Sequence, residues 1–412
     1  MKYLIKAPTH PIRTAFRLPA SKSISNRALI LNALSYSPYE INNLSDSDDT
    51  RVMVEALHSN ANHFDIGAAG TAMRFLTAFL SKIAGQWTLT GTERMKNRPI
   101  RLLVDALNSL GARIEYLEKE GYPPLRIYGS ALQGGEIHLS GEVSSQYISA
   151  LLMIAPYMEK GLRLHLEGSL ISAPYVRLTL EMMKQFGAKV RWEGACIQVL
   201  AGEYYPRPFT VEADWSAASY WYALAALSDQ GEISLQGLFK DSLQGDAALT
   251  GLFARLGVET TFTDAGVRLR HTGHICKELQ LDFVDQPDLA QTFVVACVLL
   301  NVPFRFSGLQ SLKIKETDRI EALKTELAKL GYLLRESQDN VLEWRGERCE
   351  ALSQPLIETY EDHRMAMAFA PCALARPQGI EIANPGVVSK SYPAFWNDLQ
   401  AAGFQIIMNY EL

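Results

Sequence analysis

Residues 102–116 read LLVDALNSLGARIEY, which predicts an amphipathic helix, a turn at the glycine and a short alternating strand. The same succession recurs in LEMMKQFGAKVRW (180–192), LTGLFARLGVETTF (249–262), LKTELAKLGYLLRE (323–336) and FWNDLQAAGFQII (395–407). The glycines of these segments are spaced 70 to 76 residues apart, at Gly111, Gly187, Gly257, Gly331 and Gly403. Self-similarity at a steady period is typical of a chain built from repeated structural units.

A sixth, weaker copy lies in TRVMVEALHSNANHFDI (50–66), where Asn60 takes the place of the glycine. Helices commonly end on a left-handed residue, and Asn is the next choice there after Gly. We therefore expect Asn60 to be left-handed. Six copies in 412 residues predict six copies of one α/β unit.

Each unit also contains a second helix that is apolar on nearly every side. These helices are expected in residues 23–35, 70–80, 144–158, 215–227, 288–300 and 362–374. A helix without a polar face is buried, whereas an amphipathic helix covers the surface. The segment GEYYPRPFTVEADWS (202–216) is rich in Pro and Tyr and forms a natural linker. We place a domain boundary near residue 212, with three units on each side.

The composition is that of a globular protein, with 48% apolar residues and a mean hydropathy of −0.03. No apolar run has the length of a transmembrane helix, and the first residues, MKYLIKAPTH, lack the apolar core of a signal peptide. The 5 cysteines are widely spaced and form no CxxC pair, which fits thiols in a reducing compartment, so we expect a cytoplasmic protein. The net charge of −5 argues against nucleic-acid or membrane partners.

Polar clusters stand at the starts of helices, several of them with Lys or Arg included. They are Ser21-Lys22-Ser23, Gly70-Thr71, Ser144-Ser145-Gln146, Asp288, Glu316-Thr317-Asp318 and Asp362-His363-Arg364. Ser, Thr and Asp are also ordinary helix caps, but a cap needs no cation beside it. A helix start binds anions through its unpaired N–H groups and the positive end of its dipole. If the buried helices of a domain run parallel, their starts converge on one electropositive face that suits a small anionic ligand.

Motifs for several other chemistries are absent from the sequence. There is no GxxxxGK[ST] segment and no GxGxxG after a strand, so no nucleotide cofactor is expected. His271-Thr272-Gly273-His274 offers two imidazoles without a third ligand nearby, and a polar loop is the better interpretation. No metal is expected.

Eight segments, in this order, resemble signature segments of the EPSP synthases. They are LPASKSISNRALIL (18–31), GTAMRF (70–75), RMKNRPI (94–100), SSQYISALLM (144–153), SAPYVRLTL (172–180), KIKETDRI (313–320), EDHRMAMAF (361–369) and SKSYPAFW (389–396). The resemblance covers about residues 18–397. It implies an α/β fold of two similar domains, each with three βαβαββ repeats around buried parallel helices (an inside-out α/β barrel). The domains would comprise residues 20–212, and residues 1–19 together with 213–412.

The resemblance also implies a reaction of the shikimate pathway to aromatic amino acids. The enolpyruvyl group of phosphoenolpyruvate passes to the 5-hydroxyl of shikimate 3-phosphate, and phosphate is released. C3 of phosphoenolpyruvate gains a proton while the hydroxyl attacks C2, and the tetrahedral intermediate then loses phosphate and a methyl proton. One carboxylate must handle the hydroxyl proton and a second acid–base group the C3 proton. No metal or organic cofactor is implied, and we expect a monomer whose partners are these two substrates.

Residue roles follow from the same resemblance. Asp288 would accept the hydroxyl proton, Glu316 would lie near the methylene carbon, and Lys22 would bridge both substrates. Whether Lys22 or Glu316 protonates C3 stays open. The residues implied to bind shikimate 3-phosphate are Lys22, Ser23, Arg27, Ser144, Ser145, Gln146, Ser172, Tyr175, Asp288, Ser311 and Lys315. Those implied to bind phosphoenolpyruvate are Lys22, Gly70, Arg98, Gln146, Arg319, Arg364 and Lys390.

Three positions depart from the family pattern. Ala68 and Ser311 stand where the family usually has Asn, and Phe75 stands where it often has Pro. The expected catalytic set is intact, but substrate affinity and sensitivity to the inhibitor glyphosate stay open.

Individual residues of the chain disfavour two alternative functions. The sister enolpyruvyl transferase that acts on UDP-N-acetylglucosamine usually carries an active-site Cys in its first half, whereas the first cysteine here is Cys196. A non-catalytic anion-binding protein on a related scaffold, akin to the RNA 3′-phosphate cyclases, would need the cations but not Asp288 and Glu316.

Overall fold

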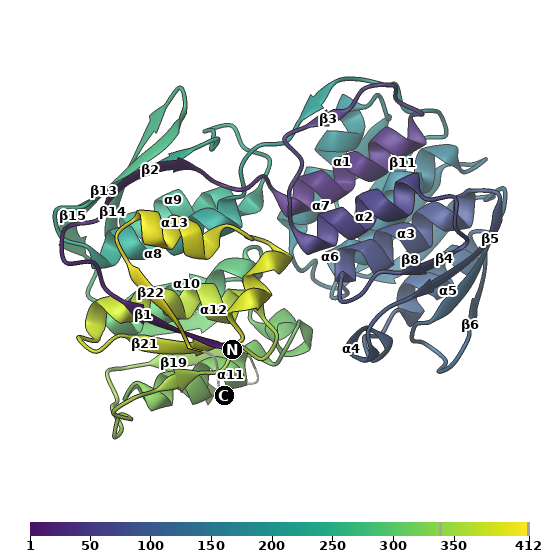
Figure 1. Ribbon diagram of the computed structural model, residues 1–412. Helices are drawn as coiled ribbons and strands as arrows, with labels where there is room; N and C mark the ends of the chain where they lie inside the picture. The colour runs from purple at the N-terminus through teal and green to yellow at the C-terminus, as the bar shows by residue number, and fades with distance from the viewer. Residues whose placement is uncertain (338–339, 410–412) are drawn as a thin grey trace. The chain divides into compact units, whose positions relative to one another are not determined.

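The computed structural model describes residues 1–337 and 340–409, and the chain divides into two compact units (Figure 1). Unit 1 comprises Met1–Pro19 and Glu212–Leu412, and unit 2 comprises Ala20–Val211. The boundaries predicted after residues 19 and 212 lie beside these limits. No helix in the described residues is long and apolar enough to span a membrane.

Three apolar helices form the interior of each unit. They are α1 (Lys22–Leu34), α3 (Gly70–Lys82) and α6 (Ser145–Ile154) in unit 2, and α8 (Trp215–Leu227), α10 (Ala290–Leu299) and α12 (His363–Phe369) in unit 1. Neighbouring inner helices contact one another within each unit. All of α12 is buried, as is α10 except its last residue, so the prediction of buried helices is confirmed.

The other helices cover the surface or make short turns. The amphipathic helices are α2 (Asp48–His58), α5 (Arg101–Ser109), α7 (Ala173–Gln185), α9 (Leu249–Ala254), α11 (Arg319–Lys329) and α13 (Phe395–Ala401), with the single turn α4 (Glu93–Lys96). The 3₁₀ segments are η1 (Ala155–Tyr157), η2 (Gly245–Ala248), η3 (Pro287–Leu289), η4 (Gln310–Ile314), η5 (Ala370–Ala375) and η6 (Pro385–Lys390). In α5 the stripe Leu103, Val104 and Leu107 faces inward, as its spacing predicts.

The described residues of unit 1 form three four-stranded sheets. Their strands, in spatial order, are β14 (Leu256–Thr263), β15 (Gly266–Ile275), β13 (Glu232–Gln236) and β2 (Arg13–Arg17); β16 (Leu279–Asp282), β17 (Phe304–Ser307), β19 (Val341–Trp344) and β18 (Arg335–Ser337); and β20 (Leu356–Ile357), β21 (Ile380–Ala383), β1 (Lys2–Lys6) and β22 (Gln405–Asn409). In the second sheet β16 and β17 are parallel across α10, and the remaining pairs are antiparallel. This succession of β16, α10, β17, α11, β18 and β19 is one βαβαββ unit.

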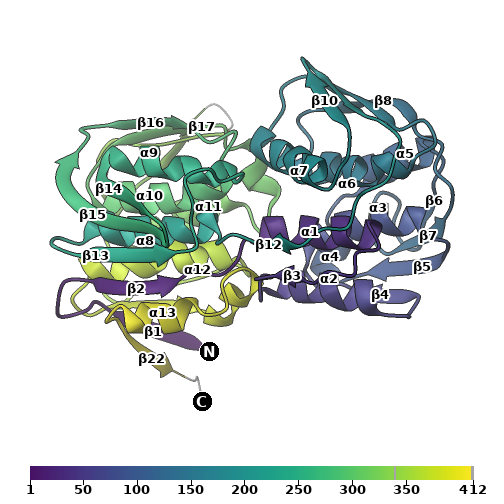
Figure 2. The ribbon, with the colours of Figure 1, turned by 90° about the horizontal axis from the view of Figure 1, so that it is seen from above.

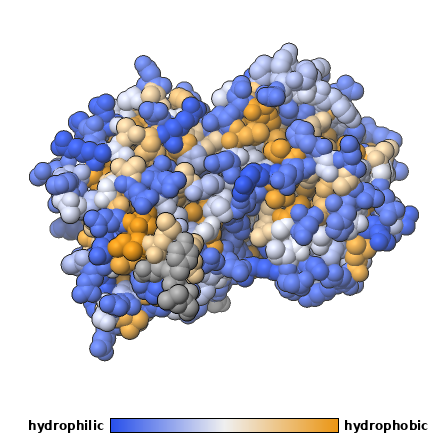
Figure 3. Space-filling view, viewed as in Figure 1, coloured by the Kyte–Doolittle hydropathy of each residue, from blue (hydrophilic) through white to orange (hydrophobic). Residues whose placement is uncertain are grey.

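Unit 2 contains two four-stranded sheets and one pair of short strands. In spatial order they are β4 (His63–Asp65), β5 (Gly85–Thr90), β7 (Leu125–Gly129) and β6 (Arg113–Tyr116); β10 (Val190–Glu193), β11 (Cys196–Val199), β9 (Leu162–Glu167) and β8 (Gly135–Ser140); and β12 (Phe209–Thr210) with β3 (Ile41–Asn42). The repeat around α1 therefore lacks the final two-strand hairpin. Figure 2 shows helices inside the sheets of each unit, and the face in Figure 3 is mostly hydrophilic with small hydrophobic groups.

The first nineteen residues supply two strands to unit 1. β1 lies between β21 and β22 and is antiparallel to both, while β2 is parallel to β13. The chain then passes through the whole of unit 2 before returning at Glu212. Unit 2 is thus an insertion in unit 1.

The repeat glycines adopt the predicted backbone conformation. Their φ angles lie between 83° and 103°, in the region that disfavours a side chain. The prediction for Asn60 is wrong, because α2 ends at His58 and Ser59 continues in extended conformation, with φ −83° and ψ 141°. This repeat has no hairpin to turn into, so the chain proceeds directly to β4.

Candidate functional site

In unit 1 Asp288 is surrounded by cations at the start of α10. One carboxylate oxygen, Oδ2, lies 2.8 Å from Nη2 of Arg364. The other, Oδ1, lies 3.2 Å from Nη1 of Arg319 and 3.5 Å from Nζ of Lys315. Burial alone would raise the pKa of Asp288, but these three charges hold it well below its usual value. The carboxylate is therefore ionised.

Arg319, the first residue of α11, is 1% exposed and joins three acids. Its Nε donates to Oδ2 of Asp362 at 2.7 Å, and its Nη2 donates to Oε2 of Glu316 at 3.0 Å. Asp362 is fully buried and also caps α12 by accepting from the backbone N–H of Arg364. Burial lowers the pKa of Arg319, but the acids more than reverse this, so the guanidinium is a fixed positive charge.

Glu316 links this group to Lys390, whose Nζ lies 3.0 Å from its Oε1. The structure thus joins in one charge network six residues singled out from the sequence, which are Asp288, Lys315, Glu316, Arg319, Arg364 and Lys390. Ser311, in η4, is not joined to it by any described contact, and its buried Oγ has no hydrogen-bond partner among the described residues.

Three further residues of unit 1 lie near this charge network but are not among the site residues predicted from the sequence. In the sequence Asp362 stands in a polar cluster at a helix start, where Asp is an ordinary cap. Tyr220 accepts from Nη1 of Arg364 at 3.4 Å, and burial raises its pKa to about 12. Asp246 accepts from the Ser216 hydroxyl, and burial, with the nearby charge of Asp288, raises its pKa to about 7. Nothing in the sequence marks the last two.

In unit 2 Lys22 opens α1, which Ser21 caps through the N–H of Ile24. The Lys22 ammonium lies 3.6 Å from Oδ2 of Asp49, a buried acid in the first turn of α2. Asp49 was not predicted as part of the site. The carboxylate of Asp49 keeps the ammonium of Lys22 beside the start of α1. The start of a helix favours a bound anion.

Arg27 is buried in a hydrogen-bond network among three helices. Its Nε donates to Thr179 of α7 at 2.7 Å and its Nη2 donates to Ser149 of α6 at 3.2 Å. Its Nη1 donates to the carbonyl of Ser23 in α1 at 2.9 Å. Its Cζ lies 5.3 Å from the centroid of the Phe75 ring. Burial lowers the pKa of Arg27 to about 10. These contacts give Arg27 a structural role beside the predicted one in binding.

A second group forms where α3 and α6 begin. A Cβ on Gly70 would lie 2.6 Å from Nη1 of Arg98, so only glycine lets this guanidinium approach the helix start. Gln146 donates to the hydroxyl of Thr71 at 3.2 Å, which joins the two helix starts. Arg74 donates to the carbonyl of Gly70 at 2.9 Å and was not in the predicted site. The two arginines and the helix dipole make this place electropositive.

The predicted serines also lie at helix starts. Ser144 caps α6 by accepting from the N–H of Gln146, and Ser145 is the first residue of that helix. Ser172 precedes α7 with φ 58°, a conformation that serine rarely adopts. The carbonyl of Tyr175 accepts from Arg27. Unit 2 thus gathers hydroxyls and cations at its inner helix starts, and unit 1 gathers acids and cations.

Comparison with known proteins shows the family to which the chain belongs. The profile of EPSP synthase (3-phosphoshikimate 1-carboxyvinyltransferase) matches residues 6–61 and 58–399. The chain belongs to the EPSP synthase family. The 3-phosphoshikimate 1-carboxyvinyltransferase of Bacteroides fragilis strain YCH46 is 60% identical over 412 residues, which is 100% of both chains. The 3-phosphoshikimate 1-carboxyvinyltransferase of Shewanella sp. strain MR-7 is 37% identical, and the match covers 96% of this chain and 98% of that protein.

Solved structures of the EPSP synthase family agree in fold. An EPSP synthase structure from Acinetobacter baumannii superposes with a TM-score of 0.80, covering 99% of this chain and 100% of that one. The identity to it is 20%, so this likeness concerns the fold alone. The prediction of a two-domain α/β fold of the EPSP synthase family is confirmed.

Proposed function

We propose that this chain transfers the enolpyruvyl group of phosphoenolpyruvate to the 5-hydroxyl of shikimate 3-phosphate and releases phosphate. The observation that carries the proposal is the pair Asp288 and Glu316, both held among cations at helix starts of unit 1. Pure anion binding needs the cations but not the acids. Family membership and the 60% identity to a 3-phosphoshikimate 1-carboxyvinyltransferase support the same reaction.

Asp288 is proposed to accept the proton of the 5-hydroxyl. The cations around it lower its pKa, which makes it a weak base as long as they face it. Substrate phosphate and carboxylate groups compete for the same cations, above all Arg364 and Lys315. Drawing these charges toward the substrates raises the basicity of Asp288 at the moment when the base is needed.

Glu316 and Lys22 are the two proposed groups for the proton at C3. Glu316 contacts Arg319 through one oxygen and Lys390 through the other, so two cations balance its charge. When a substrate anion binds one of these cations, Glu316 loses part of that stabilisation. Lys22 is an ammonium donor at the start of α1. Microscopic reversibility allows one group to deliver the C3 proton and later to remove a methyl proton.

The substrate-binding roles are proposed as the resemblance gives them. Shikimate 3-phosphate is held by Lys22, Ser23, Arg27, Ser144, Ser145, Gln146, Ser172, Tyr175, Asp288, Ser311 and Lys315. Phosphoenolpyruvate is held by Lys22, Gly70, Arg98, Gln146, Arg319, Arg364 and Lys390. The planar guanidinium of arginine suits the second task because it binds a carboxylate or phosphate through two parallel hydrogen bonds.

We further propose that the chain works as a monomer in the cytoplasm, without a metal or organic cofactor in its reaction. The 5 cysteines are free thiols, as a reducing compartment would keep them.

The test is a phosphate-release assay with phosphoenolpyruvate and shikimate 3-phosphate, run beside the same assay with UDP-N-acetylglucosamine. We expect phosphate release with shikimate 3-phosphate only, and its enolpyruvyl ether as the second product in mass spectrometry. Release with UDP-N-acetylglucosamine would assign the chain to the sister reaction. Binding of both anions without release of phosphate would indicate that the chain is an anion-binding protein and not an enzyme.

A further inference from the structure

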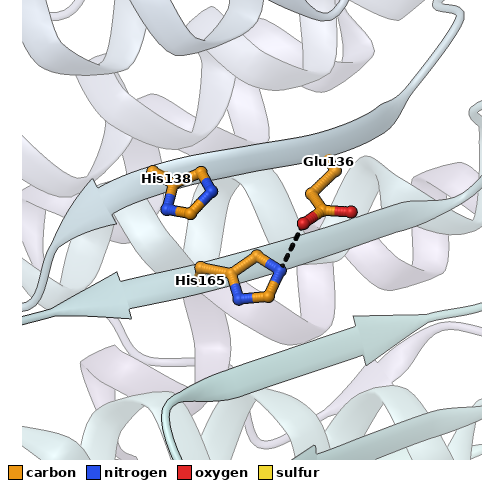
Figure 4. A group of neighbouring side chains, drawn as sticks. All are labelled: Glu136, His138 and His165. Atoms are coloured by element: carbon orange, nitrogen blue, oxygen red, sulfur yellow. Dashed lines mark ion pairs between the residues drawn. The ribbon is translucent and has the colours of Figure 1, made fainter.

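A cluster of potential metal ligands lies in unit 2, apart from the residues discussed so far. Glu136 and His138 come from β8 and His165 from the neighbouring β9 (Figure 4). One ligand atom from each of the three lies within 4.8 Å of the others. No sequence motif marks this cluster, because the third residue follows 27 positions after the second.

The strands fix the three side chains on one face of the sheet. Along β8, Ile137 and Leu139 are buried, so the alternating Glu136 and His138 point away from the core. The parallel register pairs His138 directly with His165. Their rings stack with centroids 4.8 Å apart and an angle of 15° between the planes. Backbone pairing therefore holds both imidazoles together on the outer face.

Two carboxylates complete the arrangement, each at a different imidazole. Oε1 of Glu136 lies 2.8 Å from Nε2 of His165, and Oε1 of Glu167 lies 3.1 Å from Nδ1 of His138. A histidine that binds a metal through one nitrogen commonly donates from the other to a carboxylate, which fixes the ring. Glu167 does this for His138 and leaves the Nε2 of that ring for a metal.

We propose that Glu136, His138 and His165 bind one Zn²⁺ ion, with water in the fourth position. Two imidazoles and a carboxylate are a common set of zinc ligands, at bond lengths that put ligand atoms roughly 3.3 Å apart in a tetrahedral site. Rotation of these half-exposed side chains brings the ligand atoms from their present separations to that value. The ion ties β8 to β9 and stabilises the folded sheet, and it plays no part in the proposed reaction.

Cys196 is the nearest further candidate, with its Sγ 4.0 Å from Nε2 of His165. It lies on β11, which flanks β9 on the side away from β8. We therefore exclude it from the ligand set. A Cys196→Ser variant serves as a control that keeps the surroundings of His165 nearly unchanged.

The experiment is a Zn²⁺ titration of the full-length protein against a chromogenic chelator. We expect one ion per chain, and affinity losses of more than about 100-fold in His138→Asn and His165→Asn. Glu167→Gln, which removes only the outer carboxylate, should lose about 10–100-fold. Cys196→Ser and His274→Asn, the latter removing an exposed imidazole of unit 1, should bind like the wild type.

Thermal unfolding with and without Zn²⁺ separates metal binding from a loss of fold. Zn²⁺ should raise the unfolding temperature of the wild type but not of His165→Asn, and without Zn²⁺ the two should unfold alike. Phosphate release should be the same in both. Failure to find a 1:1 zinc complex, or equal affinity in the two histidine variants and the wild type, would overturn the proposal. Loss of binding in Cys196→Ser would show that the ligand set is wrong.

Discussion

Asp288 touches three cations, and each of them is also a proposed ligand for a substrate anion. The carboxylate therefore has two states: one in which the cations suppress its basicity, and one in which bound anions share them. A variant that keeps the shape of the side chain but not its charge separates proton transfer from binding.

We expect Asp288→Asn to lower turnover by about 100-fold or more, because the amide cannot accept the hydroxyl proton. Binding of shikimate 3-phosphate, measured by calorimetry, should weaken far less. Asp241→Asn removes an exposed carboxylate of the same unit and should leave turnover unchanged. Near-normal turnover of Asp288→Asn would show that another group is the base.

Asp246 predicts a pH effect on stability. Its pKa rises from 3.8 to about 7 on folding, chiefly through burial, so the folded protein favours the protonated form. The free energy of unfolding therefore falls as the pH rises from about 4 through about 7, since ionisation then opposes folding. In Asp246→Asn this contribution is absent, and urea midpoints at about pH 5 and about pH 8 should lie closer together than in the wild type.

The control for Asp246 is again Asp241→Asn, which should retain the wild-type dependence of the urea midpoint on pH. An unchanged difference between the two midpoints in Asp246→Asn would mean that this carboxyl stays ionised in the folded protein.

At the residue scale the sequence revealed the charges but not their partners. Lys315, Arg319 and Arg364 stand in recognisable motifs, and the structure joins them around Asp288. The sequence marks Asp362 only as a possible cap, because its second role, accepting from the buried guanidinium of Arg319, depends on the tertiary contact between the starts of α11 and α12. Asp246 was missed because its burial is set by chain segments distant in sequence.

At the scale of elements, Arg27 connects α1, α6 and α7 through hydrogen bonds from its Nε, Nη1 and Nη2. Lysine at this position keeps the positive charge but cannot reach the same acceptors. We expect Arg27→Lys to lower the free energy of unfolding by about 1–3 kcal/mol, the cost of leaving a buried polar group unpaired. Urea unfolding followed by circular dichroism measures the difference.

Arg51→Lys on the exposed face of α2 is the matched control for Arg27→Lys and should change the free energy of unfolding by less than about 0.5 kcal/mol. Weaker binding of shikimate 3-phosphate with unchanged stability would contradict the structural role of Arg27.

The elements themselves were largely predictable, because the repeat sets both helix types and their order. Gly111, Gly187, Gly331 and Gly403 each follow the end of a helix, where a left-handed residue turns the chain toward the last strands of a repeat, and Gly257 is left-handed at the start of β14. Asn60 has the right residue type but no such strands after it. Local propensity cannot reveal that a repeat is shortened, since the missing hairpin is a property of the whole sheet.

At the scale of the whole molecule, the proposed ligands of each substrate come from both units. Among the residues proposed to bind phosphoenolpyruvate, Lys22 and Arg98 belong to unit 2, and Arg319, Arg364 and Lys390 belong to unit 1. We expect shikimate 3-phosphate to raise the affinity for a non-reacting analogue of phosphoenolpyruvate by about 5–150-fold, since the first ligand orders residues that the second also uses. Calorimetric titration of the analogue with and without shikimate 3-phosphate measures this factor.

Inorganic sulfate in place of shikimate 3-phosphate is the control for this coupling and should not raise the affinity. Equal affinity of the analogue with and without the first substrate would contradict the assignment of one substrate's ligands to both units.

β1 has a consequence for synthesis of the chain on the ribosome. Lys2–Lys6 leave the ribosome well before the strands on either side of them, β21 and β22, which lie near residues 380 and 405. At elongation rates of about 5–20 residues per second, the interval is roughly 20 to 80 s. The segment for unit 2 is continuous and is complete long before the interval ends. A chain that stalls after unit 2 has been made but before residue 380 would therefore carry a finished unit 2 and an unpaired apolar strand at residues 3–5, which is a target for chaperones.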